Sequence, residues 1–435
     1  MNDNPVGWLY DLQHSGIKLG LDNIRALLDV LDHPERSYPS VLVAGTNGKG
    51  SVAAMLESML RAHGIRTGMF TSPHLVRPNE RIRIDGRDIS DGALDQLLIE
   101  MRERIESGIA AGALESCPSF FEVVTATALQ AFKEREIGCG VLEIGMGGRL
   151  DATNAVDAVM SVVVTIDYDH VEKLGGTIES IAAEKAATVK PGRPLVSGVE
   201  HEAARAVLVE AAAAAGSPLI DARRVADIAH AEGERFSIHA GVQRYPDLEL
   251  PLRGRHQIEN ARVAVVALET LAPELGFDPD PSKVRKGLGN VRWPGRLQWV
   301  EGRPPLLLDG AHNPAGAQAL ADYLRSLGGE LPVLLFNAMR KKKVEEMVRP
   351  LADLIDAVVI TRARVDRAAE PEDLAPVLEP LVKRVEVVQD PGEALERARA
   401  LALPNSYVLV AGSLYLVGEI LTLSETSPAP GPVSM

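Results

Sequence analysis

Residues 44–51, AGTNGKGS, have the composition of a phosphate-binding loop. Glycines let backbone N–H groups curl around phosphate oxygens, and a lysine can reach the outer phosphates of a nucleotide. The usual spacing would put glycine at position 43 and a hydroxyl residue at position 50, whereas Val43 and Gly50 stand there and the hydroxyl follows one residue later. The alternative is a tight turn that carries a surface lysine. We predict ATP binding by Thr46, Asn47, Gly48, Lys49, Gly50 and Ser51.

Polar side chains follow four strand-like apolar runs. Ser51 follows the run 41–44, Ser72 follows 68–71, Glu143 lies within 141–144, and His170 follows 162–166. Ligands bind beyond the carboxyl ends of parallel strands, and oxygen ligands suit Mg²⁺, with imidazole as a borderline addition. Taken alone, Ser72 could be a turn residue before Pro73, and His170 could be a residue at a helix start. The carboxylate differs, because burying it unpaired in an apolar strand is costly. We predict a magnesium site at this common edge.

Short apolar runs alternate with helical patterns along the chain, as is typical of parallel α/β sheets. A helix is predicted after Ser51 with Gly64 as its stop, and another at 202–215 followed by Gly216. Residues 228–252 favour β structure. A second α/β set has strands expected at 306–309, 333–336, 357–360, 385–388 and 407–412. Proline and glycine in 291–299 mark the domain boundary.

Composition excludes some classes of partner. The chain has 435 residues, and its 46 basic and 60 acidic side chains give a net charge of −14, which argues against binding nucleic acid or anionic membrane. Two cysteines form no disulfide framework or metal spacing. No export signal precedes the first run and no apolar segment is long enough to span a bilayer. We expect a soluble, cytoplasmic, monomeric protein with small-molecule substrates.

Ten motifs in one order closely resemble the folylpolyglutamate synthase and dihydrofolate synthase family of the Mur ligase superfamily. The phosphate loop begins at residue 45, too early for the extra N-terminal domain that Mur ligases proper usually carry, and this favours the folate branch. The motifs are GTNGKGS (45–51), TSPHL (71–75), ERIRI (80–84), EIGMGGRLDATN (143–154), DYDH (167–170), EKA (184–186), GRHQIENA (254–261), WPGR (293–296), DGAHNP (309–314) and AGSLYLVGE (411–419).

The resemblance implies an α/β fold of two domains. The first is a P-loop, Mur-ligase-like domain with a parallel-sheet core that binds ATP, Mg²⁺ and folate, at 1–292. A linker at 293–298 leads to a smaller Rossmann-like ligase domain at 299–424, and we expect residues 425–435 to be a disordered tail.

The implied reaction joins L-glutamate to dihydropteroate or a reduced folate through an acyl phosphate and releases ADP and phosphate. The catalytic residues would be Lys49, Lys185 and His170. By resemblance, one Mg²⁺ lies near Ser51 and Glu143, and a second near Ser72, Glu143 and His170. The resemblance also implies that Lys185 is carbamylated and supports the second metal, which requires a lowered pKa. The alternative is an ordinary surface lysine on a helix.

The second domain is expected to complete the nucleotide site. By resemblance, Asn260 and Asp309 contact the nucleoside, Arg296 reaches the phosphates and His312 lies close by. Arg296 could instead form a linker salt bridge, and Asp309 could be a strand-end turn residue. Two segments depart from the family pattern. They are ATVK after Lys185, which bears on the helix that carries that lysine, and the loop with Lys341, Lys342 and Lys343, which bears on nucleotide or glutamate contacts.

The expected folate site combines the segments SFFE (119–122) and LDA (150–152). The phenylalanines point to a pterin, because flat pterins stack on aromatic rings. Ser119 and Glu122 also read as a capping box, and the two interpretations are compatible. Asp151 could accept hydrogen bonds from the pterin edge or cap the turn at Thr153 and Asn154. GRLDATN resembles the bifunctional bacterial enzymes. Alternatives are a folylpolyglutamate synthase alone, or a P-loop phosphotransferase or ATPase without glutamate ligation. The expected folate-binding residues are Phe120, Phe121, Glu122, Leu150, Asp151 and Ala152.

Overall fold

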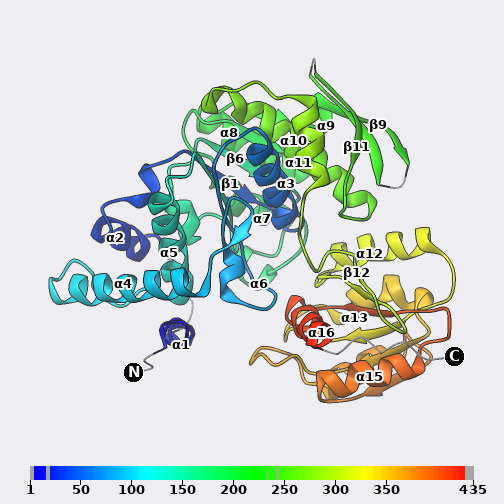
Figure 1. The fold of residues 1–435 in the computed structure, drawn as a ribbon. Helices are drawn as coiled ribbons and strands as arrows, with labels where there is room; N and C mark the ends of the chain where they lie inside the picture. The colour runs from blue at the N-terminus through cyan, green and yellow to red at the C-terminus, as the bar shows by residue number, and fades with distance from the viewer. Residues whose placement is uncertain (1–3, 16–19, 233, 242, 427–435) are drawn as a thin grey trace, which may run out of the picture. The chain divides into compact units, whose positions relative to one another are not determined.

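The computed structural model describes residues 4–15, 20–232, 234–241 and 243–426 (Figure 1). The chain divides into two compact units, and each is described by itself. Unit 1 comprises 1–251 and 257–292, and unit 2 comprises 252–256 and 293–435. Among the described residues, no helix is long and apolar enough to cross a membrane.

Unit 1 is built on an eight-stranded sheet. Its strands lie in the order β4 (Arg87–Asp88), β3 (Ile82–Ile84), β2 (Thr67–Phe70), β5 (Cys139–Glu143), β1 (Ser40–Ala44), β6 (Met160–Val163), β7 (Leu195–Ser197) and β8 (Leu219–Asp221). The strands from β2 to β8 run parallel, while β3 and β4 are antiparallel additions at one edge. The central strands β1, β2, β5 and β6 are fully buried, as their continuous apolar sequences require.

Strand register aligns the carboxyl ends that matter for the site. Val43 of β1 pairs with Glu143 of β5, Phe70 of β2 pairs with Leu142, and Ala44 pairs with Val163 of β6. The segments that follow these strands therefore leave the sheet at the same edge. This is the arrangement that the sequence predicts for Ser51, Ser72, Glu143 and His170.

Helices cover the sheet of unit 1 and shield its apolar side chains. The phosphate-loop helix α3 has buried side chains from residue 50 to residue 60 because it packs between the sheet and α11. α1, α2, α4 and α5 pack together over another part of the core (Figure 1). The helices are α1 (Pro5–Asp11), α2 (Asp22–Val30), α3 (Lys49–Ala62), α4 (Asp91–Ala110), α5 (Phe120–Glu134), α6 (Val171–Leu174), α7 (Ile178–Ala186), α8 (Glu202–Ala214), α9 (Ala222–Val225), α10 (Arg255–Leu275) and α11 (Pro281–Gly289).

The expected β segment at 228–252 forms a separate three-stranded antiparallel sheet of β9 (Ala226–Glu232), β10 (Arg235–Ala240) and β11 (Gln243–Glu249). Short 3-10 helices connect other elements of the chain. They are η1 (Leu12–Ser15), η2 (Pro34–Arg36), η3 (Pro78–Arg81), η4 (Ala152–Ala155) and η5 (Arg349–Leu354).

Unit 2 contains a six-stranded mixed sheet. Its order is β12 (Gln298–Val300), β13 (Leu306–Leu308), β17 (Val408–Ala411), β14 (Val333–Phe336), β15 (Ala357–Ile360) and β16 (Val385–Val387). Only β12 is antiparallel to its neighbour in this sheet. The helices are α12 (Pro314–Leu327), α13 (Val344–Val348), α14 (Pro371–Leu378), α15 (Pro391–Leu401) and α16 (Leu414–Thr426).

The predicted α/β architecture, with a parallel-sheet first part and a smaller α/β second part, is confirmed. Gly64 and Gly216 follow α3 and α8 with positive φ, as expected of residues that end helices. Some element limits differ from the expected ones. Strand β6 ends at Val163 rather than at residue 166, although the N–H of Val164 still donates to the carbonyl of Ala44, and α16 continues through Thr426, into the expected tail. The rest of that tail, 427–435, lies outside the described residues, and the predicted domain limits at 292, 298 and 424 stay predictions.

Candidate functional site

The phosphate loop connects β1 to α3 in a conformation that needs glycine at two positions. Gly45 has φ +153°, and a Cβ there would lie 3.2 Å from the backbone nitrogen of Thr165. Gly48 has φ +80°, and a Cβ there would lie 2.6 Å from Oδ1 of Asn260. Side chains at these positions would push the loop away from its supports. The glycines therefore let the loop lie flat against the segment after β6 and against α10.

Hydrogen bonds to the segment after β6 hold the loop in place. The N–H of Thr46 donates to the carbonyl of Thr165 at 2.8 Å, and the N–H of Asn47 donates to the Thr165 hydroxyl at 2.9 Å. The Thr46 hydroxyl donates to the carbonyl of Asp167 at 3.1 Å. Thr165 was not predicted as a loop support, because its signal in the sequence is a single hydroxyl late in an apolar run.

The N–H groups of Thr46 and Asn47 are bonded to the protein itself. The N–H groups available to a phosphate are therefore those farther along the chain, at the start of α3. That helix begins at Lys49, and the first N–H groups of a helix have no intrahelical acceptor. Together with the positive end of the helix dipole, they favour an anion there. Lys49 extends its ammonium back over the loop and donates to the carbonyl of Thr46 at 3.2 Å. The geometry fits a bound phosphate chain.

The edge of the sheet beside the loop carries the predicted metal ligands. Glu143 ends β5 and is only 5% exposed, and its Oε2 accepts the backbone N–H of Ser72 at 3.1 Å. Ser51 is buried in the first turn of α3. An almost fully buried carboxylate oxygen with hydroxyl groups on neighbouring elements is a donor set that fits Mg²⁺, which keeps several water ligands of its own.

His170 is more exposed than the other predicted metal ligands. It precedes α6 with φ +50°, and its side chain is 46% exposed, with Nε2 3.9 Å from Oδ1 of Asp169. Within the described residues, no group of three or more His, Cys, Asp or Glu side chains is arranged to hold a metal ion. The predicted set has only Glu143 and His170 of these types, so hydroxyls, water and substrate oxygens would complete it.

Lys185 lies in the last turn of α7 and is 3% exposed, so the surface-lysine alternative is wrong. Burial, and after it the positive charge of Lys49, lowers the pKa of Lys185 to about 7, although Asp169, Asp151 and Glu184 act in the opposite direction. A large fraction of this amine is therefore neutral and nucleophilic at physiological pH.

The segment ATVK supports α7 despite its departure from the family pattern. The Thr188 hydroxyl donates to the carbonyl of Lys185 at 2.8 Å, and Lys190 donates to the carbonyl and side-chain oxygens of Asn154 at 2.8 and 2.9 Å. On the other side, a Cβ at Gly148 would lie 2.4 Å from the carbonyl of Glu184. The glycine-rich loop after β5 therefore docks directly on the helix that carries Lys185.

The two adjacent phenylalanines have different surroundings. Phe120 stacks on Tyr10 with ring centroids 5.9 Å apart, and the guanidinium of Arg81 lies 5.3 Å from its centroid. Phe121 packs against the backbone after Glu143, where a Cβ at Gly145 would lie 2.5 Å from its Cζ. Phe121 is thus the aromatic ring that borders the strand end. Tyr10 and Arg81, which line the first ring, were missed because they are distant in sequence.

Glu122 and Asp151 both have structural partners. Glu122 completes the capping box of α5, with the N–H of Ser119 donating to its Oε2 at 2.7 Å. Asp151 caps η4, because its Oδ1 accepts from the N–H and the hydroxyl of Thr153 at 3.1 and 2.6 Å, and its Oδ2 accepts from the N–H of Met146 at 2.9 Å. Burial raises the pKa of Asp151, while these hydrogen bonds lower it. The capping interpretation of Asp151 is confirmed.

The expected nucleoside and phosphate contacts fall in both units. In unit 1, Asn260 lies beside Gly48 of the phosphate loop and donates to Oε1 of Gln257 at 2.9 Å. In unit 2, Asp309 accepts from the N–H groups of Leu297 and Ala311, each at 2.9 Å, so it is a strand-end turn residue as the alternative held.

Two further predicted residues surround this turn in unit 2. His312 Nδ1 lies 2.8 Å from the carbonyl of Gly310, and Arg296 donates to the carbonyl of Gly295 at 3.0 Å. His256, a partly buried imidazole in the same unit, was not predicted from the sequence; desolvation lowers its pKa, Asp309 acts to raise it and Arg296 to lower it. Its position in the GRHQIENA motif was the available signal.

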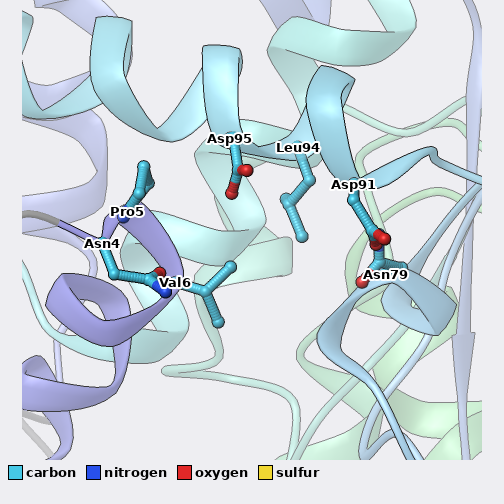
Figure 2. A pocket seen from close by; sticks show the side chains of 7 residues that line it. All are labelled: Asn4, Pro5, Val6, Asn79, Asp91, Leu94 and Asp95. Carbon is cyan, nitrogen blue, oxygen red and sulfur yellow. The ribbon is translucent and has the colours of Figure 1, made fainter.

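A separate hollow of about 330 Å³ lies between α1 and the start of α4 (Figure 2). None of the predicted site residues lines it. The lining residues are Asn4, Pro5, Val6, Asn79, Asp91, Leu94 and Asp95.

Comparisons with known proteins give consistent matches. Residues 43–268 match the Mur ligase middle domain, and residues 295–414 match the Mur ligase glutamate ligase domain. A dihydrofolate synthase/folylpolyglutamate synthase of Bacillus subtilis is 33% identical, over 95% of this chain and 96% of its own. A probable bifunctional folylpolyglutamate synthase/dihydropteroate synthase of Haloferax volcanii is 38% identical over 96% of this chain, which spans only 50% of that longer protein.

Solved structures agree. Mycobacterium tuberculosis folylpolyglutamate synthase, complexed with ADP and AMPPCP, superposes with a TM-score of 0.89 at 32% identity and covers 98% of this chain and 100% of its own. Escherichia coli FolC with DHPP and ADP has a TM-score of 0.87 at 29% identity and covers 97% and 98%. The Yersinia pestis bifunctional enzyme with AMPPNP and Mn ion has a TM-score of 0.85 at 29% identity and covers 98% of both chains. With both domains matched and full-length relatives above 30% identity, the chain belongs to the Mur ligases and, within them, to the family of folylpolyglutamate and dihydrofolate synthases.

Proposed function

We propose that this protein is an ATP-dependent ligase that joins L-glutamate to the carboxylate of dihydropteroate and of reduced folates, with release of ADP and phosphate. The observation that carries the proposal is that the phosphate loop lies close to two buried side chains, Glu143 and Lys185. Val43, just before the loop, pairs with Glu143 on the neighbouring strand, and the positive charge of Lys49 lowers the pKa of Lys185. Family membership supports the same reaction.

The chemistry follows from the poor reactivity of a carboxylate. Transfer of the ATP γ-phosphoryl group to a carboxylate oxygen forms an acyl phosphate and leaves ADP. The glutamate amine then attacks the carbonyl carbon, the C–N bond forms, the C–O bond to phosphate breaks and the amine loses a proton. Lys49 and the first N–H groups of α3 hold the β- and γ-phosphates and balance charge as the phosphoryl group moves.

Two divalent cations, Mg²⁺ in our proposal, would be held at the sheet edge. One would use Ser51 and Glu143, and the other Ser72, Glu143 and His170. A cation bound there would neutralise phosphate charge and orient the oxygens. The Mn ion in the Yersinia pestis structure supports a divalent metal in a relative. The protein's own contribution is to keep the Glu143 carboxylate buried and oriented through the N–H of Ser72.

Lys185 is proposed to carry a carbamate. Its neutral amine attacks the carbon of CO₂, an N–C bond forms as one C=O π bond opens, and a proton leaves the nitrogen. The neutral amine thereby becomes an anion with two oxygens, suited to support a metal beside the phosphate loop. The pKa of about 7, well below the ordinary 10.5 of a lysine, leaves part of the amine neutral near pH 7.

The folate would lie along the strand end between α5 and the loop after β5. Phe121 offers a ring against Gly145, in the loop that follows Glu143, Phe120 stacks on Tyr10, and Leu150 and Ala152 flank Asp151 in the chain. Asp151 would accept from the pterin edge only by sharing or exchanging a hydrogen bond that it now makes with Met146 or Thr153. Asn260, Arg296, Asp309 and His312 are proposed nucleotide contacts, each within its own unit.

The test is an assay of the purified protein with ATP, glutamate and either dihydropteroate or a tetrahydrofolate. We expect ADP, phosphate and a glutamyl product from both acceptors. AMP and pyrophosphate would exclude the acyl-phosphate route. ATP turnover that needs neither glutamate nor a pterin acceptor would instead favour the P-loop phosphotransferase alternative, and turnover with tetrahydrofolate alone would favour a folylpolyglutamate synthase without dihydrofolate synthase activity.

A further inference from the structure

The last turn of α7 carries Lys185 and needs hydrogen-bond donors from outside the helix. The final carbonyl groups of an α-helix have no N–H partner within it, and helix ends fray. Thr188 donates its N–H and its hydroxyl to the carbonyl of Lys185 at 3.1 and 2.8 Å. Val189 donates its N–H to the carbonyl of Ala186 at 3.0 Å. Because the N–H of Thr188 is used in this way, the carbonyl of Glu184 needs a donor from another segment.

Arg149, in the loop after β5, is that donor. Its backbone N–H donates to the carbonyl of Glu184 at 2.9 Å. Its guanidinium donates to the carbonyl of Ala183 at 3.3 Å and to the carboxylate of Glu184 at 2.9 Å. A Cβ at Gly148 would lie 2.4 Å from the same Glu184 carbonyl, so the glycine is what lets the loop come this close. Arg149 therefore caps the end of α7 with both its backbone and its side chain.

Asn154 strengthens the same contact. Its side-chain amide donates to the carbonyl of Arg149 at 3.1 Å and to the carbonyl of Ala187, just past α7, at 3.2 Å. Its side-chain oxygen accepts from Lys190 at 2.9 Å. Asn154 is almost fully buried, and hydrogen bonds shielded from water are electrostatically stronger. The loop and the end of α7 are thereby held as one piece.

This contact links two elements of the candidate metal site. Glu143 ends β5 in the strand that leads into the loop of Arg149, while Lys185 lies on α7. Groups that orient metal ligands without touching the metal matter nearly as much as the ligands themselves. The ion pair of Arg149 with Glu184 would contribute little by itself, because the arginine side chain is 52% exposed. The bonds to the backbone of the last turn are what fix the position of Lys185.

Charge favours the same role. Three carboxylates act on the Lys185 side chain, those of Asp169, Asp151 and Glu184, and Lys49 is the positive charge that faces it. A carbamate is an anion, so carboxylates near it would repel it unless they are balanced. The guanidinium of Arg149, 2.9 Å from the Glu184 carboxylate, balances one of the three.

We propose, on the basis of the proposed function, that Arg149 is a positioning residue for Lys185. It holds the last turn of α7 so that a carbamate on Lys185 and the carboxylate of Glu143 can support one metal ion together. Without this hold, the carbamate oxygens would no longer stay at a set distance from Glu143, and a metal would bind them less tightly.

The experiment disturbs the contact in two ways. Arg149→Met deletes the guanidinium, whereas Gly148→Ala keeps every charge but pushes the loop off the Glu184 carbonyl. Arg149→Lys keeps the charge without the paired donors and should be intermediate. Arg102→Met is the matched control, because it removes an arginine that pairs with Glu106 at 2.9 Å on α4. Melting temperatures ensure that all variants are compared while folded.

A carbon-13 carbamate signal, recorded with labelled bicarbonate and Mg²⁺ but without nucleotide or folate, measures the effect at Lys185. We expect a weaker signal in Arg149→Met and Gly148→Ala, partly restored by more bicarbonate, and the wild-type signal in Arg102→Met. Amide exchange at residues 186–189 should be faster in the two loop variants. The Mg²⁺ concentration for half-maximal ATP turnover should rise in them by about tenfold.

Faster exchange together with a wild-type carbamate signal and an unchanged Mg²⁺ response would overturn the proposal, because Arg149 would then only cap the helix. Unchanged exchange would also overturn it, since the loop would not hold α7. A wild type without a carbamate would refute both this role and the carbamate of Lys185. If the wild type carries the carbamate but does not ligate glutamate, the proposed function fails, while the carbamate signals of the variants still decide the role of Arg149.

Discussion

The backbone N–H of Ser72 donates to Oε2 of Glu143 across 3.1 Å and thereby joins the ends of β2 and β5 through a buried carboxylate. One oxygen of Glu143 is thus oriented by the protein, on the strand that pairs with β1 just before the phosphate loop. A buried carboxylate is costly to leave without a partner charge, so its place at the strand end favours a bound cation.

Replacing Glu143 with Gln separates shape from charge. The Gln side-chain oxygen can still accept from Ser72, so the melting temperature should stay close to that of the wild type. Without the carboxylate, Mg²⁺ affinity and ATP turnover should fall together, by about 10-fold or more, which corresponds to roughly 1.4 kcal/mol. A titration of turnover against Mg²⁺ measures this. Full activity of the variant at low Mg²⁺ would place the metal elsewhere.

We expect the protonation of Lys185, and its reaction with CO₂, to depend on the charge of Lys49. Lys49→Ala should abolish most phosphoryl transfer while the fold is retained, because the loop is braced by Thr46 and Thr165 rather than by the lysine. The same change removes a cation that lowers the pKa of Lys185, so it should also reduce carbamate formation there.

Carbon-13 NMR with labelled CO₂ measures the carbamate directly. We expect one carbamate signal in the wild type, a weaker one in Lys49→Ala and none in Lys185→Arg, whose guanidinium stays charged. Lys190→Arg is the matched control, since that lysine is also partly buried but bonds Asn154. A wild type without any signal would contradict the carbamate at Lys185, and a signal lost in the control would reassign it.

Much of the site edge could be predicted from sequence because parallel strands with continuous apolar runs must align their carboxyl ends. The helix after the phosphate loop and its glycine stop followed from spacing and residue type. The burial of Lys185 could not be predicted, because it depends on the docking of Gly148 against α7. For Asp151, the sequence was compatible with hydrogen bonds either to a pterin or to the following turn. Only the backbone path from Met146 to Thr153 decides which bonds form in the protein.

Acid should loosen the contact between α3 and α11. His63 donates from Nδ1 to the carbonyl of Met59 at 2.7 Å, and its Nε2 accepts the N–H of Asp280 at 3.0 Å, so the ring is neutral. Burial lowers the pKa of His63 from its ordinary 6.5. The unfolded chain therefore binds this proton more readily, and the stability gained above about pH 6.5 is lost as the pH falls through the lower folded value.

Urea unfolding at pH 7.5 and 5.5 measures this effect. The wild type should lose more stability on acidification than His63→Gln, which cannot take up the proton. His201→Gln, at an exposed helix start, removes a histidine without this contact and should behave as the wild type does. The same acid response in His63→Gln and the wild type would show that other groups are responsible.

The structural role of Asp151 changes how its proposed folate role must be tested. Asp151→Ala removes the cap of η4 and the bond to Met146, so it should cost about 1–2 kcal/mol of stability whatever the substrate. Thr153→Val is the matched control. It removes the hydroxyl that donates to Asp151 at 2.6 Å but leaves the carboxylate and its bond to Met146 in place.

If Asp151 accepts hydrogen bonds from the pterin, Asp151→Ala should lower kcat/KM for dihydropteroate by about 10-fold or more, since a charge-assisted hydrogen bond contributes roughly 1.5–3 kcal/mol. Extension of tetrahydrofolate should fall less, because its longer tail lets the pterin lie farther from the metals. Thr153→Val should keep both activities near those of the wild type. Kinetics with both acceptors, together with melting temperatures, distinguish the cases. An equal loss of both activities in both variants would mean that Asp151 serves only to shape the loop between β5 and η4.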